Sequence, residues 1–196
     1  MGPEYNCYAS DITTSFPANG KFTDKQKIIY NAVLDANRAV LKEAKPGVRW
    51  TDMHILSEKV ILNHLKQAGI VVGVCSLLLF IIPIYAELII GCLTSFYIAW
   101  FKKSVITIEP GCYFIDTLLD AAFANPVQAK FLVREEIDKY RGSGGVGFSI
   151  LLVRIEDDVI IWANGNENMS DVPRTIEEIE QFMSSGNFSD TNGLQK

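Results

Sequence analysis

Residues 105–116 read VITIEPGCYFID, and the fold of the surrounding chain depends on this stretch. The β-branched run at 105–108 predicts a strand, since such side chains favour extended backbone. Glu109 stands at the end of that strand, and Pro110-Gly111 predicts a turn directly after it. A carboxylate beside a buried strand is costly unless a positive charge neutralises it, so Glu109 is a candidate site residue.

Two further carboxylates stand in similar positions. Asp11 lies inside residues 5–16, YNCYASDITTSF, whose aromatic and β-branched residues predict a strand or hairpin arm. Glu156 lies in the predicted strand 154–162, RIEDDVIIW. Hard cations such as Mn²⁺ or Mg²⁺ prefer carboxylate oxygens, which makes a metal site one interpretation. Pairing of these carboxylates with Arg154 or a lysine is the other, and spacing alone does not separate the two.

The intervening segments predict four helices, so the chain is α+β. Capping boxes at Thr23–Gln26 and Thr175–Glu178 predict two helix starts. The other two helices are predicted over about 51–69 and about 125–140, the latter because Asn125-Pro126 is a favoured start. The inward faces are predicted to be Ile29, Val33, Ala36 and Val40 in the first helix, Ile55, Leu62 and Leu65 in the second, and Ile176, Ile179 and Met183 in the last.

Charge and cysteine content exclude several classes of function. The net charge of −5 gives no electrostatic basis for binding nucleic acid, whose phosphates require a basic surface. Acidic residues crowd the segment 156–180, which is either a solvated face or partly a cation site. The four cysteines have no CxxC spacing, which argues against a zinc knot and a disulfide framework and favours an intracellular compartment.

An apolar stretch interrupts the chain just before the strand at 105–108. Residues 71–101 read VVGVCSLLLFIIPIYAELIIGCLTSFYIAWF, with Glu87 as the one charge. This exceeds the roughly 20 apolar residues that cross a bilayer as a helix. The segment 71–103 therefore predicts an extra apolar helix, either a membrane span near 77–101 or a helix packed on the domain. A span would place Asp11 and Glu109 on opposite sides of the membrane, which favours the packed helix.

Several long stretches of the sequence resemble those of a known family. They are YASDITTSFPANGKFTDKQKIIYNAVLDANRAV, KPGVRWTDMH, VITIEPGCYFID, GGV, RIEDDVII and VPRTIEEIEQFM. Together they resemble the catalytic domain of the prolidase (Xaa-Pro dipeptidase) family, peptidase family M24, in the creatinase/aminopeptidase-P group. The resemblance implies an incomplete pita-bread fold. It divides the chain into a first catalytic part at 1–70, an apolar insertion at 71–103, a second catalytic part at 104–185 and a tail at 186–196.

The resemblance also implies an activity and a set of site residues. The family hydrolyses dipeptides with a C-terminal proline through two manganese ions held by Asp, Asp, His, Glu and Glu. Asp11 matches the second aspartate, Glu109 the first glutamate and Glu156 the last glutamate, which bridges the two ions. Glu109 also matches the residue that handles the proton of the attacking water, and Arg154 matches an arginine near the substrate. The family further implies a cytoplasmic homodimer.

The departures from the family imply a loss of chemistry. The family's first aspartate lies just before the residue matching Met1, and its histidine segment is replaced by 71–103. A second foreign apolar piece, 147–153, splits the last matched word, as in a truncated chain with two insertions. His54 and His64 match no ligand, so at most one weakly bound Mn²⁺ and no turnover are expected. The three carboxylates should repel one another and raise at least one pKa. The alternative is a membrane-anchored chain or a non-catalytic pseudo-peptidase that acts as a binding or dimerising module.

Overall fold

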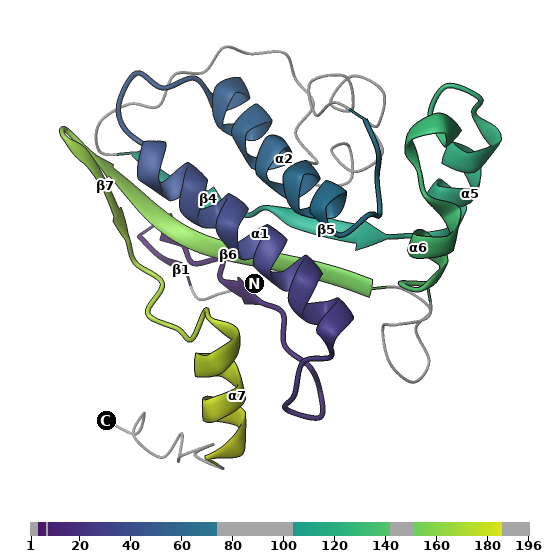
Figure 1. Cartoon of the computed structure of the whole chain (residues 1–196). Coiled ribbons are helices and arrows are strands. Elements are labelled where there is room, and N and C mark those ends of the chain that lie inside the picture. The colour runs from purple at the N-terminus through teal and green to yellow at the C-terminus, as the bar shows by residue number, and fades with distance from the viewer. Residues whose placement is uncertain (1–3, 7, 74–103, 142–150, 186–196) are drawn as a thin grey trace.

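A long central strand organises the molecule (Figure 1). The computed structural model describes residues 4–6, 8–73, 104–141 and 151–185. Strand β6 (Leu151–Trp162) pairs antiparallel with every other strand of its sheet. One edge of β6 pairs with β4 (Ser104–Ile108) and β5 (Gly111–Phe114), and the opposite edge pairs with β3 (Thr13–Thr14) and β7 (Gly165–Asn168). A two-stranded hairpin of β1 (Glu4–Tyr5) and β2 (Tyr8–Ala9) precedes β3.

Strands β4 and β5 follow one continuous register along β6. Ile108 pairs with Asp157, and Gly111 pairs with Arg154 at the same offset. Pro110 interrupts the ladder because it has no N–H to donate, although its carbonyl accepts from Ile155 N–H at 3.2 Å. Glu109 therefore stands directly across from Glu156, in the gap between two paired strands. The strand predicted over 105–108 is present, but the turn predicted at Pro110-Gly111 is wrong, because β5 continues along β6 in the direction of β4.

Two helices cover one face of the sheet, and the core lies between these layers (Figure 1). Alternation along a strand sends odd- and even-numbered residues to opposite faces. Every odd-numbered residue of β6 from Leu151 to Ile161 is buried. Their partners come from α1 (Asp24–Glu43) and α2 (Trp50–Gln67). All four residues predicted to face inward from α1 are buried, and the capping box at Thr23 and Gln26 is present.

Some predicted helices differ from the observed ones. The second helix is close to its predicted range, but Ile55 is 40% exposed while Leu62 and Leu65 are buried. The helix predicted over 125–140 is wrong. The chain instead forms α5 (Asp116–Ala124), a 3₁₀ turn (Ala129–Phe131) and α6 (Arg134–Asp138). Asn125 ends α5, and its side-chain oxygen accepts from the Val127 and Gln128 N–H groups, which makes a turn in place of a helix.

The two predicted insertions fall largely outside the described residues. Of the first, only 71–73 is described; Val71 is buried and bridges to Leu132, and Val72 N–H donates to the Phe131 carbonyl at 2.9 Å. The predicted apolar helix and membrane span lie within 74–103, outside the description. No helix in the described ranges is both long and apolar enough to cross a membrane. Of the second insertion, 147–150 is not described, and 151–153 forms the start of β6, which extends the strand predicted from 154.

Helix α7 (Ile176–Ser184) closes the described chain and packs beside the start of α1. The predicted capping box of Thr175 and Glu178 is present. Ile176 and Ile179 are buried in the main core, and Met183 packs against it, as expected. Phe22 N–H donates to the Glu180 carboxylate at 3.0 Å, which ties the helix to the loop before α1. The segment before α7 therefore lies close to the sheet.

Candidate functional site

The three predicted metal ligands lie on the sheet face opposite the helices. Glu156 is an even-numbered residue of β6, so it points away from α1. Glu109 stands across from it and shares its face, because directly opposed residues of antiparallel strands point the same way. Asp11 lies two residues before Thr13, the β3 partner of Glu156, and outside the strand in which it was predicted. The fold thus brings Asp11 and Glu156, which are more than a hundred positions apart in the sequence, to one face together with Glu109.

Glu156 is the most buried of the three, with 4% of its surface exposed. Its Oε2 accepts a hydrogen bond from Thr13 Oγ1 at 2.5 Å. Burial raises the pKa of Glu156, the bond from Thr13 opposes that rise, and the charges of Glu109 and Asp11 add to it. The expected pKa rise from mutual repulsion is therefore present, with burial as its largest cause. The three carboxylates act on one another electrostatically.

Glu109 is held by an arginine rather than left to solvent. Arg154 Nη1 donates to Glu109 Oε2 at 2.8 Å, and Thr107 Oγ1 donates to Oε1 at 3.1 Å. Arg154 Nε also donates to the Tyr113 hydroxyl at 2.6 Å. The predicted substrate residue Arg154 and the predicted catalytic residue Glu109 therefore form one ion pair. The pairing interpretation of the sequence is correct for Glu109. In the part of the chain that the structure describes, no ion pair joins Glu156 to a cation, although the nearby charge of Arg154 lowers the Glu156 pKa.

Gly111 allows this chain of contacts. A Cβ at Gly111 would lie 2.5 Å from the Tyr113 hydroxyl and 3.1 Å from the Val153 carbonyl. The Tyr113 ring therefore crosses the strand at a place where no side chain intervenes, which brings its hydroxyl to Arg154. Sequence reasoning did not single out Tyr113. The signal was its spacing, since Tyr113 and Glu109 lie four apart along extended backbone and share a face.

Asp158 is a fourth carboxylate on this face and was also missed. Its carboxylate accepts from the Asp11 backbone N–H at 3.2 Å, and its own N–H donates to Ser170 Oγ at 3.0 Å. Asp158 is 8% exposed and Asp157 is 1% exposed, so the acidic segment is not a solvated face where it begins. The period-two pattern of the predicted strand could have placed Asp158 beside Glu156, but the acidic run concealed it.

The two histidines lie in the helical layer, away from this face. His54 Nε2 lies 2.8 Å from a Glu58 oxygen, and His64 Nε2 lies 3.0 Å from an Asp35 oxygen. Both partners lie in helices, Glu58 in α2 and Asp35 in α1. Within the described parts of the chain, no three His, Cys, Asp or Glu side chains come close enough to form a metal cluster. The carboxylates therefore share a face without converging on one point.

The chain is similar to proteins of the family that its sequence resembles. The model of metallopeptidase family M24 matches residues 1–163. The human Xaa-Pro dipeptidase is 42% identical over 210 aligned positions, which cover 93% of this chain and 41% of the relative. The Xaa-Pro dipeptidase of Rattus norvegicus is 41% identical with the same coverage. The chain thus spans about two fifths of the length of these curated relatives.

The chain is also similar to solved structures of aminopeptidases. The aminopeptidase PepP of Pseudomonas aeruginosa matches with a TM-score of 0.65 and 28% identity, over 93% of this chain and 40% of that one. A zinc-substituted Escherichia coli aminopeptidase P in complex with product matches with a TM-score of 0.66 and 25% identity, over 91% of this chain and 38% of that one. The likeness confirms the expected α+β, pita-bread architecture.

Proposed function

Because this chain belongs to metallopeptidase family M24, we propose that it carries the carboxylate side of a peptidase centre for dipeptides with a C-terminal proline. The observation that carries the proposal is the shared face of Glu156, Glu109 and Asp11. Among the described residues, Glu156 is buried without an ion-pair partner of its own, and such a charge is normally neutralised. A divalent ion is the neutralising group that matches oxygen donors of this kind.

Each residue has a distinct role in this proposal. Glu156 and Asp11 hold the cation, and Thr13 orients the Glu156 carboxylate. A bound ion of this class supplies Lewis acidity and lowers the pKa of coordinated water. Glu109, half-buried just after β4, is the residue that would accept and return a proton in an active centre. Arg154 offers a planar, permanently charged fork that suits a substrate carboxylate.

The residues fit one cation better than two. Both histidines are paired in the helical layer, so they supply no nitrogen ligand to the polar face. Glu109 shares its charge with Arg154, which weakens it as a ligand. We therefore propose that one Mn²⁺ binds weakly and that the chain as given binds substrate without measurable turnover. That places it as a binding module derived from a dipeptidase.

Metal binding by the purified chain tests this function. Isothermal titration with Mn²⁺ should give at most one ion per chain, with binding lost in Glu156→Gln. Glu167→Gln is the matched control, because Glu167 lies on β7 of the same sheet with an exposed side chain that accepts from Trp162 Nε1. Absence of Mn²⁺ binding in the unmodified chain, or equal binding in Glu156→Gln, would overturn the proposal.

Hydrolysis of glycyl-proline separates a binding module from an enzyme. The unmodified chain and Glu156→Gln should release proline at the same background rate in excess Mn²⁺. A rate that is higher in the unmodified chain and falls in Glu156→Gln would show a working centre. In that case the carboxylates assigned above would keep their roles, and the proposed lack of turnover would be wrong.

A further inference from the structure

We propose that Arg174 is a positioning residue for the carboxylate face: it fastens strand β3 to β6 and so fixes Asp11 relative to Glu156. The purpose of this contact rests on the proposed function, whereas the contact itself does not. Arg174 lies in the loop before α7, 18 positions from Glu156, and only 9% of its surface is exposed. Arg174 lies in the matched stretch VPRTIEEIEQFM, but the resemblance assigns it no role.

Strand β3 needs such a contact because it is very short. It comprises Thr13 and Thr14, which pair with Glu156 and Ile155. A two-residue strand forms few ladder bonds, so its register depends on side-chain contacts as well. Ser15 Oγ, which donates to the Arg154 carbonyl and accepts from the Arg154 N–H, supplies one such contact, and Arg174 supplies another. Asp11 lies just before this strand, so any slip of β3 along β6 would carry Asp11 away from Glu156. A one-residue slip would turn the β3 side chains to the opposite face.

The Arg174 guanidinium contacts both strands at this pair. Nη1 donates to the Thr13 carbonyl and to Thr14 Oγ1, each at 2.7 Å. Nη2 donates to the Glu156 carbonyl at 2.6 Å and to Asp157 Oδ1 at 2.5 Å. Four hydrogen bonds therefore connect one planar group to both strands, two of them to the carbonyls of the paired residues Thr13 and Glu156. The bonds come from the helix-facing side, because Asp157 and Thr14 point that way.

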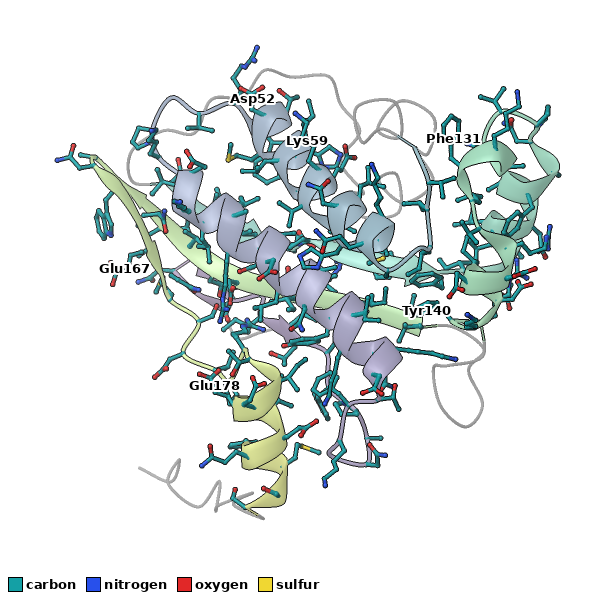
Figure 2. All side chains as sticks on the ribbon, in the orientation of Figure 1. Asp52, Lys59, Phe131, Tyr140, Glu167 and Glu178 are labelled. Atoms are coloured by element: carbon teal, nitrogen blue, oxygen red, sulfur yellow. The ribbon has the colours of Figure 1, made fainter. Side chains whose placement is uncertain are left out.

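Arg174 is itself held from three directions. The Asp157 carboxylate, 1% exposed, balances its charge. The Tyr30 hydroxyl of α1 donates to the Arg174 carbonyl at 2.9 Å. Its backbone N–H donates to the Glu178 carboxylate at 3.0 Å, and Figure 2 shows Glu178 at the start of α7. Helices α1 and α7 thus fix the Arg174 backbone and Asp157 holds its guanidinium, which in turn holds β3.

Lysine cannot replace this group. A guanidinium is a rigid fork with five donors, whereas an ammonium is a compact charge on a flexible stem. Arg174→Lys keeps the charge beside Asp157 and loses the bridge between the two strands. Arg141→Lys is the matched control. Arg141 also has carboxylate partners, Asp120 at 2.7 Å and Asp138 at 3.1 Å, but at the end of α6.

Hydrogen–deuterium exchange of the full chain tests the contact. In Arg174→Lys, peptides covering residues 9–16 should exchange at least about tenfold faster, while peptides of β4, β5 and β6 change no more than in Arg141→Lys. A general loss of stability would accelerate all these segments together. Thr14→Val removes one acceptor of Arg174 and should give a smaller change confined to 9–16. Unchanged exchange there, or equal acceleration everywhere, would overturn the inference.

Mn²⁺ titration tests the positioning role separately from the proposed function. Folded Arg174→Lys should bind Mn²⁺ about 10–100-fold more weakly than the unmodified chain, the usual effect of losing support behind a ligand, and Arg141→Lys should not. Unaltered affinity despite faster exchange at 9–16 would overturn the positioning role. If the unmodified chain binds no Mn²⁺, the proposed function fails, and the exchange experiment alone decides whether Arg174 fastens β3.

Discussion

The two faces of strand β6 are built by different forces. On the helix-facing side, Val153, Ile155, Val159 and Ile161 are buried against α1 and α2, and burial of apolar area stabilises this face. The opposite side carries Arg154, Glu156 and Asp158, held by hydrogen bonds and charge. Apolar packing tolerates no gap but needs no partner of defined chemistry. The polar face depends on individual donors, and its buried carboxylate stays costly without a cation.

Asp157 is the exception on the apolar face, and its removal should have the largest effect. Asp157→Ala leaves the Arg174 charge buried without its carboxylate partner, which typically costs about 3–5 kcal/mol. Asp158→Asn, the neighbour on the polar face, keeps an acceptor for the Asp11 N–H and should cost about 1 kcal/mol or less. Urea denaturation of both variants measures the difference. Similar losses would show that Asp157 and Arg174 are not a coupled buried pair.

Truncation of an apolar side chain should separate the faces almost as clearly. Ile155 is fully buried on the helix-facing side, so Ile155→Ala should cost about 2–5 kcal/mol through lost burial and a cavity. Leu152, three residues away on the same strand, is 51% exposed on the polar side. Leu152→Ala should change the free energy of unfolding by about 0.5 kcal/mol or less. A comparable loss in both variants would contradict the exposure of Leu152 on the polar side.

Neutralising Glu156 should stabilise the metal-free chain. The pKa of Glu156 is raised in the folded state by burial and by Glu109 and Asp11, so its protonated form is favoured there. The resulting stability is fully present below the unfolded pKa and is lost as the pH rises through the folded pKa. Glu156→Gln removes that loss, so its advantage over the unmodified chain should grow from about pH 4 towards neutrality.

Urea denaturation in a chelator, repeated from pH 4 to pH 8, measures this advantage. Glu167→Gln again serves as control, since its side chain is exposed on β7. Curves for Glu156→Gln and the unmodified chain that run parallel across this range would contradict the raised pKa. Added Mn²⁺ should reverse the order, because a ligand that binds only the folded state stabilises the form that binds it.

Local signals in the sequence predicted much of the fold. The capping boxes at Thr23 and Thr175 and the apolar spacing of α1 depend on neighbours within one helical turn, and the structure contains them. The start predicted at Asn125-Pro126 failed because the surroundings overrode it. Leu132 pairs with Val71 and Val133 N–H donates to the Ile70 carbonyl, which draws this segment into extended backbone. Contacts between residues about sixty positions apart leave no periodic trace in either segment.

The site was predicted only where stretches of the sequence match those of the family. Asp11, Glu109 and Glu156 were singled out, and the structure places them on one face; their roles stay predictions. The link between Arg154 and Tyr113 depends on Gly111 letting a ring cross the strand, which spacing does not reveal. Arg174 stands in a loop, where no period fixes the direction of a side chain. Its contacts follow from the path of the chain before α7.

Chemical labelling of the Cys112 thiol tests how tightly the apolar face is closed. Cys112 pairs with Val153, is fully buried, and burial raises the pKa of its thiol to about 12. The thiolate is the reactive form, and the raised pKa leaves very little of it in the folded molecule at pH 8. Iodoacetamide should therefore label Cys112 only when the helix layer separates from β6. Molecules in which the helix layer stays on β6 should remain unlabelled.

Peptide mapping by mass spectrometry measures this labelling at Cys112 alone, with the same chain in denaturant as the fast reference. Ile155→Ala should speed the labelling because it loosens the layer that covers Cys112, whereas Leu152→Ala should leave the rate unchanged. Ile155→Ala alters the helix-facing side of β6 and Leu152→Ala alters the polar side. The ratio of their labelling rates therefore reports on the helix-facing side. Equal rates in both variants would mean that Cys112 is reached from the polar face, and that the core does not seal this strand.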